Sequence, residues 1–242
     1  MRAVILAGGK GARLHPYTIV FPKPLMPING SPILDIVITQ LRNHGFDHIT
    51  LAVGYMADMI KTYFNGSKKF DVKIDYSQED HPLGTIGALS LIEDLPENFL
   101  VMNGDILTDL DFSKFFDFHL QEGALATVAT YSKEVSIEYG IVECDHRDGI
   151  IGYREKPKLV YQVSMGIYAF SSKMLRYIRR GDYLDFPELV NLLIQRGERV
   201  ISFPVSGYWK DIGCYSDYEK AAEDFDKMRE KFCAPNMIRT KE

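Results

Sequence analysis

The sequence predicts an α/β fold: a Rossmann-like, mixed but mostly parallel sheet flanked by helices, with a smaller β-rich subregion. Short apolar stretches typical of buried strands alternate with amphipathic stretches typical of helices. This alternation gives parallel strands joined by right-handed crossovers. A glycine-rich loop directly follows the first strand, and ligands of such sheets bind at the carboxyl ends of strands. The early predicted strands cover 1–7, 48–53 and 72–76, and the predicted helices cover 31–44 and 56–64.

Composition limits the class of protein. The chain has 242 residues, of which 46% are hydrophobic and 25% charged, as in an ordinary globular domain. A net charge of −5 argues against nucleic-acid binding. No apolar run approaches the ~20 residues of a membrane helix, and the N-terminus does not resemble a signal peptide. The three cysteines show no paired spacing. We therefore expect a cytoplasmic protein without a membrane or nucleic-acid partner.

The loop after the first strand is a candidate phosphate site. Gly8, Gly9 and Gly11 allow backbone N–H groups to approach an anion closely. The guanidinium of Arg13 can fork onto phosphate oxygens. Lys23 stands between two prolines, which restrict the backbone on either side of this second cation. Together these residues predict a polyphosphate site.

The spacing of the glycines excludes two common nucleotide loops. A Walker A loop continues as Gly-Lys-Ser/Thr after four residues, and neither Gly8 nor Gly9 has that continuation. The dinucleotide fingerprint requires a glycine where Leu14 stands. On these residues alone, a tight strand-to-helix turn with two surface cations remains an alternative.

Two segments, Leu6-Ala7-Gly8-Gly9-Lys10-Gly11-Ala12-Arg13-Leu14 and Phe21-Pro22-Lys23-Pro24-Leu25, resemble the signature of the sugar-1-phosphate nucleotidyltransferases. The resemblance continues to about residue 218. Ala12 stands where the family usually has Thr, so one hydroxyl for a phosphate is missing. The resemblance implies that Arg13 and Lys23 are catalytic and that the nucleotide is bound by Leu6, Ala7, Gly8, Gly9, Gly11, Arg13, Lys23, Glu79, Gly84 and Asp105.

The helix predicted at 31–44 has signals at both ends. Ser31 is a plausible N-cap, and Pro32 suits the first helical position. Gly45 can end the helix in a left-handed conformation. The apolar residues that recur at helical spacing and should face the sheet are Leu34, Val37, Ile38 and Leu41.

The segment 79–88, after the third strand, resembles the part of the family that recognises the base. Glu79 matches the side-chain position, and Gly84 supplies backbone. A carboxylate can accept from both N1–H and N2–H₂ of guanine, whereas uracil and thymine offer one such donor. The sequence Pro-Leu-Gly-Thr at 82–85 resembles the mannose-1-phosphate guanylyltransferases, so GTP is favoured. Thr85 could cap a helix running to about residue 94. The alternative to base recognition is simply a loop with a helix start.

Asp105 follows a buried strand run at 99–102 and is a candidate magnesium ligand, because hard cations prefer carboxylate oxygen. An Asx turn at 103–105 is the alternative. The resemblance implies that Asp105 holds Mg²⁺ and that Asp211, within the motif at 208–213, is the second ligand. We therefore expect Asp211 to lie beside Asp105.

Shorter β segments follow residue 139, and 141–144 and 150–154 predict a hairpin. The resemblance implies that the Gly140 backbone and the Glu155 carboxylate bind sugar hydroxyls, and that Lys156 grips the sugar phosphate. A charged strand end before a proline turn is the alternative.

The stretch 163–168 corresponds to a family strand that usually carries Asn-Ala-Gly. Here Ser164 lacks the expected amide donor, and Met165 is larger than Ala; Gly166 is retained. The resemblance implies that Ser164 and Gly166 contribute to the sugar-phosphate site, while the identity of the sugar stays open.

The other predicted elements complete one domain over 1–242. Residues 1–135 form the nucleotide-binding half, 136–218 the sugar-binding half, and 219–242 the end of a C-terminal helix and a tail. That helix packs over the fold or meets another subunit, so a homodimer is one compatible assembly. The remaining predictions are helices at 113–120 (Phe115, Phe116 and Leu120 inward), 171–179, 186–195 and 215–232, and strands at 124–131 and 200–204.

The resemblance implies attack by a sugar 1-phosphate on the α-phosphorus of an NTP, with Mg²⁺ as cofactor. GTP and mannose 1-phosphate or a manno-heptose 1-phosphate are favoured, giving an NDP-sugar and pyrophosphate. A glucose-1-phosphate uridylyl-, thymidylyl- or cytidylyltransferase is the alternative within the family. Two alternatives lie outside this family. One is a non-catalytic nucleotide-sugar-binding regulatory protein. The other is a nicotinamide oxidoreductase, which the missing third glycine argues against.

Overall fold

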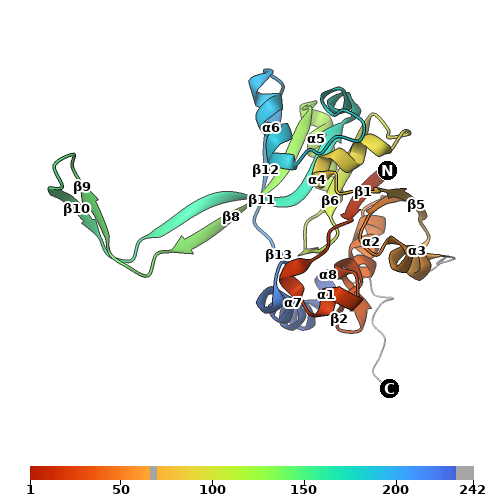
Figure 1. Cartoon of the computed structure of the whole chain (residues 1–242), viewed down its shortest axis with the longest axis horizontal. Coiled ribbons are helices and arrows are strands. Elements are labelled where there is room, and N and C mark those ends of the chain that lie inside the picture. Colours follow the sequence, from red (N-terminus) through yellow and green to blue (C-terminus); the bar gives the residue numbers. More distant parts are fainter. Residues whose placement is uncertain (66–69, 233–242) are drawn as a thin grey trace.

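The computed structural model describes residues 1–65 and 70–232 of the chain. Its main sheet has the strand order β12-β8-β11-β6-β1-β4-β5 (Figure 1). Strand β11 runs antiparallel to both of its neighbours, and the other neighbouring pairs are parallel. The predicted α/β class with a mixed, mostly parallel sheet is thus confirmed. The strands are β1 (Arg2–Ala7), β4 (His48–Val53), β5 (Lys73–Gln78), β6 (Asn98–Asn103), β8 (Ala126–Ser136), β11 (Lys158–Ser171) and β12 (Val200–Val205).

Helices cover both faces of this sheet. Because side chains alternate along a strand, Ala3 and Ile5 of β1 enter one core, and Val4 enters the other. The first core takes apolar residues of α2 (Ile33–Asn43), α3 (Ala57–Phe64), α5 (Phe112–Glu122), α7 (Tyr215–Lys227) and α8 (Arg229–Phe232). The second takes those of α4 (Gly84–Gly87), η4 (Ala88–Leu91), η5 (Ser172–Tyr177) and α6 (Phe186–Gln195).

Ser31 does not cap α2, because this helix begins at Ile33 and Pro32 holds the N-cap position.

Two further local expectations are wrong. Leu120, expected inward, is 46% exposed, while Phe112 of the same helix is buried. Thr85 does not cap a helix to about residue 94, because the segment Gly84–Gly87 packs against the chain before α6. The N–H groups of Ile86 and Gly87 both donate to the carbonyl of Leu184 at 3.0 Å, and the chain continues as η4.

Beyond Tyr131 and Val163, strands β8 and β11 leave the sheet as a two-stranded ribbon that projects from the body (Figure 1). At its tip lies the predicted hairpin of β9 (Ile141–Cys144) and β10 (Ile150–Arg154). We call residues 132–163 the arm. Strand β8 therefore extends past the predicted end at residue 131.

Short elements complete the described structure. Among the described residues, no helix is long and apolar enough to cross a membrane. The remaining elements are η1 (Ala12–Leu14), α1 (Tyr17–Val20), η2 (Lys23–Leu25), β2 (Pro27–Ile28), β3 (Ser31–Pro32), β7 (Ile106–Thr108) and β13 (Trp209–Asp211).

Candidate active site

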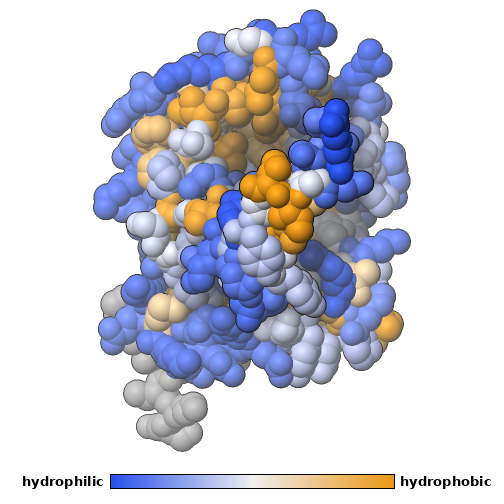
Figure 2. Space-filling model, turned by 90° about the vertical axis from the view of Figure 1, so that its left-hand side faces the viewer, coloured by the Kyte–Doolittle hydropathy of each residue, from blue (hydrophilic) through white to orange (hydrophobic). Residues whose placement is uncertain are grey.

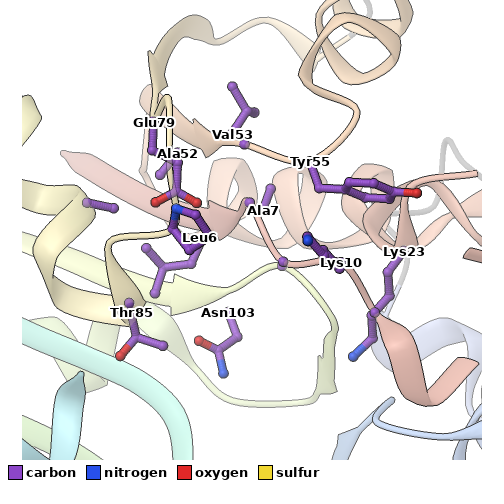
Figure 3. Close-up of a pocket in the computed structure, with 18 of the residues that line it drawn as sticks. Leu6, Ala7, Lys10, Lys23, Ala52, Val53, Tyr55, Glu79, Thr85 and Asn103 are labelled. Atoms are coloured by element: carbon purple, nitrogen blue, oxygen red, sulfur yellow. The ribbon is translucent and has the colours of Figure 1, made fainter. Parts of the chain in front are cut away.

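A cavity of about 810 Å³ lies at the carboxyl ends of β1, β4 and β6 (Figure 3). Its size suits a nucleotide-sized ligand. All ten residues predicted to bind the nucleotide line it, which brings together parts of the chain as distant as Leu6 and Asp105. The ten are Leu6, Ala7, Gly8, Gly9, Gly11, Arg13, Lys23, Glu79, Gly84 and Asp105.

The glycine loop packs closely over the second cation. Gly11 has a left-handed φ of 61°, and its carbonyl accepts the Thr18 hydroxyl at 2.8 Å. A Cβ at Gly11 would approach the Lys23 Cβ to 3.2 Å, so glycine allows the loop to lie on that side chain. Lys23 itself is only 9% exposed. The loop and the lysine are therefore held as one unit.

Glu79 lies at the side of the pocket away from Lys10 and Lys23 (Figure 3). One of its carboxylate oxygens accepts the N–H of Leu83 at 3.1 Å. The other lies against the glycine loop, because a Cβ on Gly8 would approach Oε1 to 2.6 Å. The pocket thus has an acceptor at one end and cations at the other.

Asp105 and Asp211 lie side by side, as the family resemblance implies. Strand β13 pairs Asp211 with Ile106 of β7, and the N–H of Ile212 donates to the Asp105 carbonyl at 3.0 Å. Burial, followed by the charge of Asp105, raises the pKa of Asp211, while Lys23 and Arg13 oppose that shift. Two carboxylates therefore repel each other beside two cations.

The two aspartates fit a divalent cation. Lys23 donates to Oδ2 of Asp105, whereas Oδ1 is buried and has no hydrogen-bond partner among the described residues. Within that part of the chain, no group of three or more His, Cys, Asp or Glu could hold a metal. Mg²⁺ commonly uses one or two carboxylates and completes its coordination with substrate phosphates and water. Asp105 and Asp211 provide two such carboxylates.

Arg13 reaches the same end of the pocket. Its guanidinium lies against Gly213, where a Cβ would approach Nη1 to 3.1 Å. The side chain is exposed to solvent, and it also stabilises the charged form of Asp211. Arg13 is therefore free to contact a bound anion.

The predicted sugar residues divide into two groups. Gly140, Glu155 and Lys156 lie on the arm and do not line the pocket. They are close to one another: the Tyr153 hydroxyl donates to Glu155 Oε2 at 2.9 Å, and it packs so closely on Gly140 that a Cβ there would overlap it. Gly140 and Glu155, both predicted to bind the sugar, thus lie together but away from the pocket.

Ser164 and Gly166 lie at the base of the arm. Gly166 has a φ of 72°, and a Cβ there would approach the Asn103 amide nitrogen to 2.6 Å. Asn103 lines the pocket, so Gly166 contacts a lining residue without lining the pocket itself. The Ser164 hydroxyl donates to the Tyr168 hydroxyl at 3.3 Å.

Further pocket residues were not among the predictions. Lys10 lies within the glycine-rich loop and Asn103 two residues before Asp105, and this closeness to predicted site residues is the signal in the sequence. Asp185 lines the pocket, accepts the N–H of Thr85 at 2.9 Å and forms a capping box with Glu188. The box is visible in the sequence as Asp-x-x-Glu, but its contact with Thr85 is not.

The fold and the pocket define a class: an α/β nucleotide-binding protein with paired carboxylates and cations at the phosphate end. Residues 2–228 match the family described as Nucleotidyl transferase, and the chain belongs to that family. The resemblance to sugar-1-phosphate nucleotidyltransferases is thereby confirmed at family level.

Relatives within the family differ in their named substrates. The chain is 34% identical to UTP--glucose-1-phosphate uridylyltransferase of Synechocystis over 91% of its length. It is 33% identical to the mannose-1-phosphate guanylyltransferase catalytic subunit beta of Danio rerio over 90%. The chain spans 62% of the length of both relatives. The crystal structure of HddC from Yersinia pseudotuberculosis complexed with GMP-PN is 30% identical, with a TM-score of 0.71, covering 93% of this chain and 99% of HddC.

Proposed function

We propose that the chain transfers a nucleotidyl group from an NTP to a sugar 1-phosphate and releases pyrophosphate. The observation that carries this proposal is the polarity of the pocket. Glu79 provides a base acceptor at one end; Asp105, Lys23 and Arg13 line the other, and Asp211 lies beside Asp105 without lining the pocket. A nucleoside triphosphate has matching ends, a base edge with donors and a highly charged phosphate chain.

The reaction needs no nucleophile from the protein, because the sugar phosphate is itself an anion. The difficulty is to bring two anions together in line, which positioning and charge neutralisation overcome. Arg13 balances charge on the triphosphate and on the departing pyrophosphate, and Lys23 lies near the α-phosphate. Asp105 and Asp211 would hold Mg²⁺, which supplies positive charge to phosphate oxygens when bound.

GTP is the favoured nucleotide. The Glu79 oxygen that faces Gly8 accepts no hydrogen bond from the described residues, so it can take a donor from guanine. The name of the Danio rerio relative and the GMP-PN complex of HddC agree with a guanine nucleotide and a manno-configured sugar. The Synechocystis relative supports UTP with glucose 1-phosphate as the second candidate.

Glu79→Gln should reduce the preference for GTP over UTP by about tenfold or more, because it replaces a charged acceptor with a neutral amide. The ratio of kcat/KM for the two nucleotides measures this preference. The control is Glu97→Gln, the same change on an exposed carboxylate that does not line the pocket, and it should leave the ratio unchanged. If the ratio is also unaltered in Glu79→Gln, the base is recognised elsewhere.

A substrate matrix tests the proposal as a whole. Pyrophosphate release is measured for GTP, UTP, dTTP and CTP against mannose, manno-heptose and glucose 1-phosphates. We expect release only when both substrates are present, fastest with GTP and a manno-configured sugar. Nucleotide binding without release from any pair would instead support a regulatory protein.

A further inference from the structure

The arm, residues 132–163, carries predicted site residues away from the pocket they would serve. Gly140 and Glu155 contact the Tyr153 hydroxyl, and Lys156 follows Glu155 in the chain. No described residue of the arm lines the pocket. The lining residues that follow the arm in the chain are Tyr183, Asp185 and Gly213. If these arm residues act on a sugar phosphate, the arm has to meet a pocket.

The ribbon of the arm has one apolar face. Residues that oppose each other in an antiparallel pair point to the same face, and Leu159 opposes Val135 while Val163 opposes Tyr131. The other face is polar apart from Val160, with an ion pair of 2.9 Å between Lys158 and Glu134. The side chains of the apolar face are Tyr131, Val135, Leu159, Tyr161 and Val163, with Lys133 among them.

The described chain covers this apolar face only in part. Tyr131, at the base, packs against Trp209, and Leu159 and Val163 are half-buried. Val135 and Tyr161 are exposed. Figure 2 looks onto the arm and shows hydrophobic residues gathered on it in front of the body. Ile150 is 71% exposed and Tyr139 78%. An isolated two-stranded ribbon is at best marginally stable in water, and it needs a surface or a further strand to pack against. The other exposed large apolar residues of the arm are Val135, Val142, Ile151, Tyr153, Val160 and Tyr161.

The surface beside the pocket is apolar too. Helix α1 and the residue after it expose Tyr17, Ile19, Val20 and Phe21. This surface adjoins the phosphate end, because the Thr18 hydroxyl binds the carbonyl of the glycine loop. The body therefore offers an apolar contact surface next to the cations.

The arm extends away from its own pocket as a continuous ladder. Its strands pair in register from Lys158–Ser136 to Ser164–Thr130, and the register shifts between Ser164 and Tyr168, where the arm joins the central sheet. Docking of the extended arm on a second copy preserves this ladder and its backbone hydrogen bonds. Seven exposed side chains, Val160 of the polar face not included, of on the order of 100 Å² each let two exchanged arms bury about 1,400 Å², which is within the range of a standard stable interface.

We propose that two copies of the chain exchange their arms, so that Glu155 and Lys156 of each copy complete the pocket of the other. Such an exchange is two-fold symmetric, because each copy gives one arm and receives one. Lys156 then brings positive charge to the sugar phosphate, and Glu155 accepts from sugar hydroxyls. This inference rests on the proposed function for the role of the two residues, but not for the contact itself.

Sedimentation velocity tests the contact without any activity. Tyr161→Glu disrupts the apolar face while placing an acid opposite Lys133, and Val160→Lys changes the polar face while placing a base opposite Glu134. Both variants therefore retain a favourable cross-strand pair. We expect dimers for the wild type and for Val160→Lys, and monomers for Tyr161→Glu at micromolar concentration. A monomeric wild type, or two variants that behave alike, overturns the proposal.

Mixed dimers test the exchange of site residues. Chains with Asp105→Asn and chains with Lys156→Ala are co-expressed with different tags and purified through both. With exchanged arms, one pocket of each mixed dimer has both residues intact, so about half of the wild-type pyrophosphate release returns. With arms acting on their own pocket, each pocket has one defect and no activity returns.

The reciprocal dimer is the matched control. Pairing a wild-type chain with a chain that carries both substitutions should give an inactive dimer if arms are exchanged, because each pocket then has one defect. Half of the activity in this dimer, and none in the first, overturns the proposal. A wild type without any pyrophosphate release contradicts the proposed function instead, and sedimentation still decides whether the arms are exchanged.

Discussion

Asp105→Asn is expected to reduce nucleotidyl transfer by at least about 1,000-fold while the protein stays folded. Asp105 lines the pocket, forms an ion pair with Lys23 and lies beside Asp211. Its buried Oδ1 has no hydrogen-bond partner among the described residues. Replacing the carboxylate with an amide removes a charge that a divalent cation requires and leaves Lys23 without its counter-ion.

Pyrophosphate release over a Mg²⁺ titration measures this effect, and circular dichroism checks the fold. Binding of Mn²⁺, followed by electron paramagnetic resonance, gives a readout besides activity and should weaken in the same variant. The control is Asp117→Asn, the same change on the exposed side of α5. A fully active Asp105→Asn enzyme would show that this carboxylate is not a metal ligand.

Arg13→Ala is expected to lower kcat by about 100-fold or more, the effect of removing one electrostatic donor from a transition state. The guanidinium lies against Gly213 at the phosphate end, close enough to influence the charge of Asp211. Its positive charge therefore stands where charge develops on the departing pyrophosphate.

Steady-state kinetics at saturating substrate isolates this effect from binding. The matched variant is Arg42→Ala, which removes an exposed guanidinium paired with Asp71 at 3.1 Å on the surface. Exposed pairs of this kind contribute about 0–1 kcal/mol to stability, so kcat should not change. An unaltered kcat in Arg13→Ala would remove Arg13 from the mechanism.

The nucleotide half was largely predictable because its signals are local. Alternation of strand and helix patterns defined the sheet, and the glycine loop followed β1 at the expected edge. The position of Asp211 beside Asp105 came from the family resemblance, since no local pattern connects residues so far apart. Thr85 shows the limit of a capping signal: the backbone of Leu184 binds the following residues and prevents a longer helix.

The sugar half was less predictable because its position depends on non-local packing. The hairpin strands Ile141–Cys144 and Ile150–Arg154 were predicted from their patterns. Their separation from the pocket depends on how far β8 and β11 continue past the sheet, which the sequence does not reveal. The register that aligns Val135 with Leu159 becomes known only from the strand pairing. The roles of Gly140, Glu155 and Lys156 stay predictions.

The fate of labelled phosphorus in GTP tests nucleotidyl transfer most directly. The protein is supplied with mannose 1-phosphate and GTP that carries the label at either the α or the γ position, and the products are separated. We predict that the α label appears in a nucleotide sugar and the γ label in pyrophosphate. Transfer of the γ label to the sugar, or retention of both labels in GTP with every sugar 1-phosphate tried, would contradict attack at the α-phosphorus.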